Sequence, residues 1–343
     1  MADVSTPSPS SSRPPAGASA TTVASASLVG SAIVVGSAAL FGTLGPVSRV
    51  AFEAGVEPPA WVAWRASIGL LAIVAVIGWR IRRGRAVLVR PSDLTDRTKV
   101  GLMLAGITGF TLNLCLFAAF DRITVALALL CFYTYPALVA AVHIASGREP
   151  LDAPRALALL LSMVGMVAVV ASQLDPSVGV AIDPLGIAFA AGAAISQTIY
   201  VTIARSYRAV PSDQAIAVVM GITVIGATAT AILVGSAASL AIPATTPSLI
   251  PLVLFTGICA AAVPSLGFLV GIRLIGGLRA GILMLFEPVV GVALAAWLLS
   301  ERLTAIQVAG AVAILVAAVI LQRAAPEADE PASHTAVAVG GGP

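Results

Sequence analysis

The chain has 343 residues, of which 59% are hydrophobic and only 10% are charged, and its mean hydropathy is +1.02. Soluble domains carry about 25% charged residues because their surfaces face water, so this composition excludes an ordinary soluble protein and predicts an all-α integral membrane protein. The net charge of +3 comes from short loops between apolar runs, which leaves no basic, aromatic-interleaved surface for nucleic acid.

The two ends of the chain differ from the apolar middle. Residues 1–24 are rich in Ser, Pro, Ala and Thr and have Arg13 as their single basic residue. This composition predicts a disordered tail without the charged start of a signal peptide. Residues 323–343 contain three acidic residues and end in Gly-Gly-Gly-Pro, which predicts a second solvated tail.

Between the tails lie ten apolar segments, each close to the roughly 20 residues that cross a bilayer. They are continuously apolar and lack the alternation of barrel strands, and backbone groups in lipid must be paired within a helix or a closed barrel. The sequence therefore predicts ten transmembrane helices. The expected spans are 25–48, 58–79, 100–120, 123–145, 154–173, 184–206, 213–238, 248–272, 275–299 and 304–322.

The distribution of basic residues predicts the orientation in the membrane. The loop after the second span carries seven of them, and the same side of a ten-span topology receives six more from other loops and two from the tails. The opposite side has only Arg49, Arg122 and Arg302. Both termini are therefore expected in the cytoplasm, in a multi-pass protein of the cell (plasma) membrane. Eighteen arginines against one lysine suggest a bacterial source.

The chain also contains an internal repeat, which appears when it is aligned with itself at an offset of 152 residues. Pro136 then meets Pro288, and Glu149 meets Glu301. Thr304 with Gln307 fits a helix-capping box, and Asp152 occupies the matching cap position in the first half. Five spans per half is an odd number, so the halves are expected to be inverted, as in many secondary transporters.

These residues resemble a known family. Phe-Glu-Pro at 286–288, the stretch Trp-Leu-Leu-Ser-Glu-Arg-Leu-Thr at 297–304, and Gln307 with Gly310 resemble the end of an EamA domain of the drug/metabolite transporter superfamily. The first half repeats the pattern more loosely. The resemblance implies two EamA repeats, expected at 25–173 and 174–322, and transport, often export, of amino acids, other metabolites or drugs.

Two charged residues lie well inside predicted spans, Glu287 and Arg65. An intramembrane charge costs about 2.5–3.5 kcal/mol at a helix centre on insertion scales, so each must face protein or water. Glu287 is too short to reach either interface and is a candidate site for a substrate ammonium group or a proton. Arg65 is a candidate clamp for a carboxylate or phosphate; the alternative is snorkelling to the outer interface beside Trp61.

Further polar and aromatic residues are candidates for the lining of a midplane site. Hydrogen bonding between helices or aromatic packing is an equally good interpretation for each of them. They are Tyr133, Tyr135, Asn113, Gln197 and Tyr200. Four prolines inside spans predict kinks or hinges, because proline removes a backbone donor; these are Pro46, Pro136, Pro264 and Pro288. No metal or cofactor is expected, since Cys115, Cys131 and Cys259 lie in apolar runs without paired spacing.

The leading hypothesis is a secondary transporter that exports a small metabolite, such as an amino acid or a drug-like compound, by alternating access. Protons are candidate coupling ions through Glu287, and the expected partners are the small molecule and the lipid bilayer. Two alternatives stay open: a nucleotide-sugar or phosphometabolite carrier of the same superfamily, and a non-transporting channel or scaffold. An enzyme is disfavoured because the chain has two histidines and no catalytic cluster.

Overall fold

The computed structural model describes residues 20–146, 152–172, 183–291, 293 and 304–323, and every regular element among them is helical. Seven stretches are long and apolar enough to span a membrane, and two shorter apolar helices cover Ser27–Phe41 and Ala305–Ile320. The ninth predicted span, 275–299, lies partly outside the described residues. An all-helical membrane protein is therefore confirmed, whereas the count of ten spans stays a prediction.

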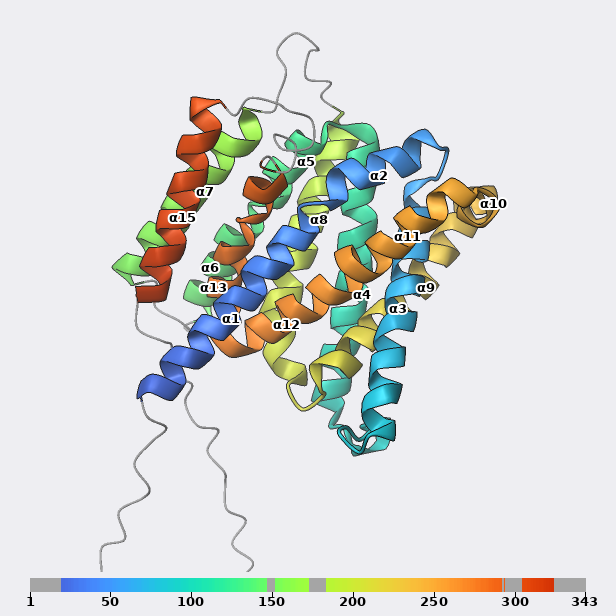
Figure 1. Cartoon of the computed structure of the whole chain (residues 1–343), viewed down its shortest axis with the longest axis horizontal. Helices are drawn as coiled ribbons and strands as arrows, with labels where there is room; N and C mark the ends of the chain where they lie inside the picture. The colour runs from blue at the N-terminus through green and yellow to red at the C-terminus, as the bar shows by residue number, and fades with distance from the viewer. Residues whose placement is uncertain (1–19, 147–151, 173–182, 292, 294–303, 324–343) are drawn as a thin grey trace, which may run out of the picture.

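The first half of the chain runs from the helix that begins at Ala20, five residues before the predicted first span, to the end of α7 (Figure 1). Its helices are α1 (Ala20–Phe41), α2 (Leu44–Glu53), α3 (Pro58–Arg82), the short 3-10 turn η1 (Pro91–Asp93), α4 (Asp96–Arg122), α5 (Val125–Phe132), α6 (Tyr135–Ala145) and α7 (Ala153–Ala171).

The second half begins at α8 and ends at α15. Its elements are α8 (Pro184–Ile203), η2 (Ala204–Tyr207), α9 (Ser212–Leu233), η3 (Ala237–Ala241), α10 (Ile242–Thr245), η4 (Pro247–Leu249), α11 (Ile250–Gly257), the π-helical turn η5 (Ile258–Ala262), α12 (Val263–Ile275), α13 (Gly277–Met284) and α15 (Ala305–Arg323).

The internal repeat has the same backbone break in both halves. The fourth predicted span breaks between α5 and α6, where the Thr134 N–H bonds the Cys131 carbonyl at 3.4 Å. The ninth breaks after α13, where the Phe286 N–H bonds the Leu283 carbonyl at 3.1 Å. These two bonds are 152 residues apart, and each precedes a proline, which lacks the N–H that would continue the α-helical pattern.

The predicted helix starts of the fifth and tenth spans are also confirmed. The Thr304 N–H bonds Gln307 Oε1 at 2.8 Å and the Gln307 N–H bonds Thr304 Oγ1 at 3.2 Å, which is the reciprocal capping box. In the first half, Asp152 accepts from the Arg155 N–H at 3.1 Å. The matched residues Glu149 and Glu301 lie outside the described residues.

The largest helix contacts join one half of the chain to the other. They pair α7 with α15, α4 with α8, α3 with α9, and α1 with α12. If each helix is replaced by its counterpart in the other half, the same four pairs result, as expected for related repeats. The backbones of α7 and α15 contact each other at two glycines. A Cβ built on Gly165 would lie 2.6 Å from the Gly310 carbonyl oxygen, so this close approach is possible because Gly165 has no side chain.

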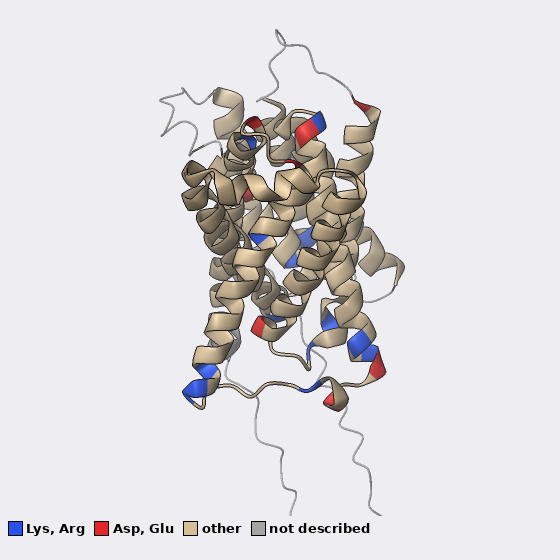
Figure 2. Ribbon diagram, turned by 90° about the vertical axis from the view of Figure 1, so that its right-hand side faces the viewer, with Lys and Arg blue, Asp and Glu red and all other residues tan. Residues whose placement is uncertain are grey.

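Figure 2 shows many of the lysines and arginines at the lower end of the helical body, with a few more near mid-height and at the upper end. Arg97 and Arg205 share a depression at one end, between the start of α4 and η2. Arg49 and Arg122 share another depression with the end of α2 and the α4–α5 turn. The two groups that the sequence assigned to opposite sides of the membrane are therefore separate in space.

Candidate functional site

A cavity of about 130 Å³ lies between the two halves. Six of the eight residues proposed from the sequence line it: Glu287, Arg65, Asn113, Tyr135, Gln197 and Tyr200. The other two, Trp61 and Tyr133, are fully buried and are not part of the lining. The remaining wall is mostly apolar and comes from both halves: Phe41, Leu44, Val62, Ala66, Gly109, Leu112, Leu116, Phe117, Phe132, Ile216, Val219, Met220, Thr223, Ala261, Ser265, Phe268 and Met284.

Arg65 is turned into the protein and is only 3% exposed. Its Nη2 donates to the Ala260 carbonyl at 3.1 Å, and its Cζ lies 4.6 Å from the centre of the Phe117 ring. The Nε atom is buried and has no hydrogen-bond partner. A snorkelling arginine would carry its head group to the interface, so this alternative is not what the structure shows.

Trp61 does not form an interfacial anchor beside Arg65. Its ring is 0% exposed, and its Nε1 donates to Ser48 Oγ at 3.0 Å. This hydrogen bond ties α3 to α2 within a cluster of buried side chains. Trp61 therefore stands behind the cavity wall, where it packs the helix that carries Arg65.

Glu287 is half-buried and follows the break at the end of α13. It lies close enough to the hydroxyls of Tyr133 and Tyr135 to interact electrostatically with both. Among the described side chains, no ion pair within 4.0 Å joins Glu287 to Arg65. The cavity therefore holds one potential anion and one cation on separate parts of its wall, from different halves of the chain.

The uncharged polar residues of the wall are partly satisfied by the helices themselves. The Tyr135 hydroxyl donates to the Gly281 carbonyl at 3.4 Å, which joins α6 to α13. Asn113 Nδ2 donates to the Gly109 carbonyl one turn earlier, at 2.9 Å. Since the Asn113 carbonyl oxygen is not used in this bond, that side chain can still accept a hydrogen bond from a ligand.

The four prolines have different surroundings. Pro136 and Pro288 follow the two breaks described above, and Pro46 lies in α2, just after the turn that separates it from α1. Pro264 lies at the start of α12, directly after the π-helical turn η5. π-helical turns of this kind are rare and are often found at functional sites. This turn faces Arg65, which donates a hydrogen bond to it. The positions of these residues in the sequence do not predict this contact.

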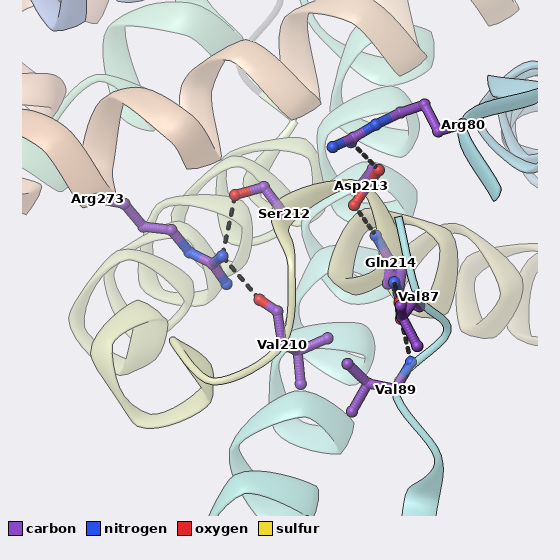
Figure 3. A network of polar contacts seen from close by, with 8 residues as sticks. All are labelled: Arg80, Val87, Val89, Val210, Ser212, Asp213, Gln214 and Arg273. Atoms are coloured by element: carbon purple, nitrogen blue, oxygen red, sulfur yellow. Dashed lines mark hydrogen bonds and ion pairs between the residues drawn. The ribbon is translucent and has the colours of Figure 1, made fainter. Parts of the chain in front are cut away.

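A polar network at one end of the bundle was not predicted (Figure 3). Asp213, which is 4% exposed at the start of α9, pairs with Arg80 of α3. Gln214 donates to the Val87 carbonyl at 2.9 Å and accepts from the Val89 N–H at 3.0 Å. The network fastens the segment after α3 to α9. In sequence, these residues are indistinguishable from ordinary loop residues.

Arg273 extends this network to α12. Its Nη1 donates to the Val210 carbonyl at 2.8 Å and to Ser212 Oγ at 2.9 Å, and its Nη2 donates to the Tyr207 carbonyl at 3.2 Å. The guanidinium thus holds the turn between η2 and α9, and Figure 3 shows its bonds to Val210 and Ser212. These Arg273 contacts lie within the second half of the chain, whereas those of Asp213 and Gln214 join the two halves at the same end of the bundle.

Two related sets of apolar helices around a cavity with separate charges define a polytopic helical membrane protein. A model described as the EamA-like transporter family matches the sequence twice, over residues 28–171 and 184–323. The chain therefore belongs to the EamA-like transporter family, as the sequence motifs indicated.

A solved structure titled only "Crystal structure of protein" is similar with a TM-score of 0.66 and 20% sequence identity. The match covers 87% of this chain and 96% of that chain, and it shows a shared fold. No curated protein is similar enough in sequence to match.

Proposed function

We propose that this protein is a secondary transporter that exports a small metabolite, such as an amino acid or a drug-like compound, across the plasma membrane. The single observation that carries the proposal is the cavity between the repeats, which both Arg65 of the first half and Glu287 of the second half line without forming an ion pair with each other. If Arg65 and Glu287 served only to pack the helices, they would be expected to form an ion pair with each other, because an unpaired charge in a membrane is costly.

The proposed mechanism is alternating access by two inverted five-span halves, ten spans in all. Its support is the symmetric set of helix pairs between the halves and their matching breaks. In Figure 1, α1 begins at the lower edge of the helical body and α8 begins at the upper edge, which agrees with inversion. Rocking of such halves exposes a central site to each side in turn. The excess of basic residues at the lower end supports cytoplasmic termini.

In this mechanism, Glu287 binds an ammonium group or a proton, and Arg65 binds an anionic group. Tyr135, Gln197, Tyr200 and Asn113 orient the ligand, and the aromatic wall covers its apolar part. A nucleotide-sugar or other phosphorylated cargo is less well supported, since Arg65 is the single Lys or Arg in the described cavity lining. Phosphates need more compensating positive charge than one guanidinium provides.

A screen for resistance and efflux tests the proposal. Cells that express the wild-type chain are compared with cells that express Glu287→Gln, over a panel of amino acids and antimicrobial compounds. Resistance with increased export of one compound, lost in the variant at equal membrane abundance, is the expected result. Equal growth and equal intracellular content in both strains across the panel would count against transport. Reporter fusions at each terminus test the orientation.

A further inference from the structure

The carbonyl of Ala260 has lost its normal partner in the helix. In an α-helix this oxygen accepts from the N–H of residue 264, but residue 264 is proline, which has no N–H. Ala260 lies within the π-helical turn, where the Val263 N–H bonds the Ile258 carbonyl. The eighth predicted span thus lacks the usual α-helical donor for the Ala260 carbonyl, close to the cavity wall formed by Ala261 and Ser265.

Arg65 supplies the missing donor from the other half of the chain, at 3.1 Å. The two helices approach closely enough for this because glycines face each other: a Cβ on Gly69 would lie 3.0 Å from the Gly257 carbonyl oxygen, and one on Gly257 would lie 3.1 Å from the Arg65 carbonyl oxygen. Phe117 supports the flat face of the guanidinium. The group is therefore held from two sides.

Holding the guanidinium at Ala260 uses only a fraction of its donors. A guanidinium has five N–H groups in a fixed fork, and the Nε of Arg65 is buried without a partner. The Nη N–H groups that do not bond the Ala260 carbonyl belong to a side chain that lines the cavity. An oxyanion in the cavity would accept from them the charge-assisted hydrogen bonds that arginine favours.

We infer that Pro264, by freeing the Ala260 carbonyl, positions Arg65 to bind the carboxylate of a small, largely apolar substrate. Pro264 is then a positioning residue that determines specificity for acids over their uncharged analogues. The inference rests on the proposed function only in taking this cavity as the ligand site. It requires binding and does not require that the ligand be moved.

The size and lining of the cavity limit the substrate class further. The cavity of about 130 Å³ is well above the roughly 10–15 Å³ that a single water needs, so it has room for a small molecule. Aromatic side chains such as Phe41, Phe132 and Phe268 favour an apolar or aromatic body. One guanidinium matches a singly charged carboxylate better than a phosphate, whose second charge would stay uncompensated.

Equilibrium binding to the purified full-length protein in lipid nanodiscs tests the inference. The probes are phenylacetate and phenylacetamide, which match in shape and size and differ in charge. The wild-type protein is expected to bind the acid at least about tenfold more tightly than the amide, as a charge-assisted hydrogen bond implies. Arg65→Gln keeps a donor for Ala260 and is expected to remove this preference. Equal affinity of wild type for both probes would overturn the inference.

The role of Pro264 is tested by Pro264→Ala, which restores an N–H for the Ala260 carbonyl and so competes with Arg65. Binding of phenylacetate is expected to weaken by about three- to tenfold, with binding of the amide unchanged. Pro251→Ala is the matched control, because Pro251 lies in the first turn of α11, where a missing N–H is harmless. Equal behaviour of the two proline variants would overturn the positioning role. An acid preference in a protein that exports nothing would support this inference and contradict the proposed function.

Discussion

Gly42 and Glu287 meet at the point where two broken helices cross. A Cβ built on Gly42 would lie 2.8 Å from the Glu287 carbonyl oxygen, closer than real Cβ contacts come, and the Gly291 N lies 3.4 Å from the same position. Gly42 is the first residue after α1, and Glu287 is the acidic residue of the cavity. The placement of the carboxylate therefore depends on the absence of a side chain in a different span.

The first prediction follows from this contact. Gly42→Ala is expected to displace the backbone at Glu287 and to lower the stability by about 1–3 kcal/mol, as overpacking does, together with a loss of transport. The measurement is the thermal unfolding midpoint of the purified protein. Gly36→Ala in the same helix is the control, because nothing lies within 4 Å of its new Cβ. A Gly42→Ala protein as stable as the Gly36→Ala protein would contradict the described contact.

The second prediction concerns the carboxyl group of Glu287. Glu287→Gln keeps the shape of the side chain but can neither ionise nor exchange a proton, so export is expected to fall by about tenfold or more and to lose its dependence on an imposed pH gradient. The measurement is efflux of the compound found in the screen. Glu53→Gln, at an exposed position at the end of α2, is expected to behave as wild type. Wild-type export with an intact pH dependence in Glu287→Gln would exclude a role for the carboxylate.

The third prediction concerns the polar network of Figure 3. Asp213→Asn removes the buried negative charge that pairs with Arg80, and the loss of this charged hydrogen bond is expected to lower the stability by about 1.5–3 kcal/mol. The segment after α3 should also become more accessible to protease, since it is held next to this pair by Gln214. Asp96→Asn is the control, since its pair with Lys99 is exposed to solvent and should contribute little. Equal unfolding midpoints for the two variants would contradict the prediction.

The fourth prediction is a pH dependence at the other end of the bundle. Arg122 donates to Asp183 at 2.9 Å, and this hydrogen bond, with the Leu185 N–H, holds the pKa of Asp183 below its ordinary value. A lowered pKa in the folded state stabilises the fold above about pH 4, the usual pKa of aspartate, and this stabilisation is lost as the pH falls through the lowered pKa.

Asp183→Asn, which keeps a good N-cap for α8, is therefore expected to unfold at a lower temperature than wild type between pH 7 and pH 5, by a constant difference. The difference should shrink below about pH 4. Asp121→Asn, at an exposed position in the same region, should show no such pattern. If the difference in unfolding temperature persisted below about pH 4, the loss of stability would come from the changed N-cap of α8 rather than from the charge of Asp183.

Several features of the fold could be predicted because their causes are local in the chain. Composition indicated the membrane, and the offset of 152 residues found the repeat, in whose two halves the structure has matching backbone breaks at Thr134 and Phe286. The capping box at Thr304 was predicted for the same reason, since it involves residues three apart. The orientation in the membrane stays a prediction.

The site was predicted only in part. Glu287 and Arg65 stood out as charges in apolar runs, and both line the cavity. Trp61 was placed at the interface because aromatic rings near span ends are common there, but its ring is fully buried against α2. The apolar cavity residues, such as Phe117 and Met220, gave no signal, because side chains that face lipid and side chains that face a cavity are equally hydrophobic in a membrane protein.

The sequence alone determined that this protein is an all-helical membrane protein built as two repeats, because hydrophobic length, proline positions and caps act within one segment. The tertiary structure decided which segments meet: it brought Arg65 to the Ala260 carbonyl, 195 residues away, and Gly42 to Glu287. When a helix is apolar on every side, its sequence does not indicate which face contacts a neighbouring helix. Only the packed bundle shows which donors are satisfied by the chain and which are left for a ligand.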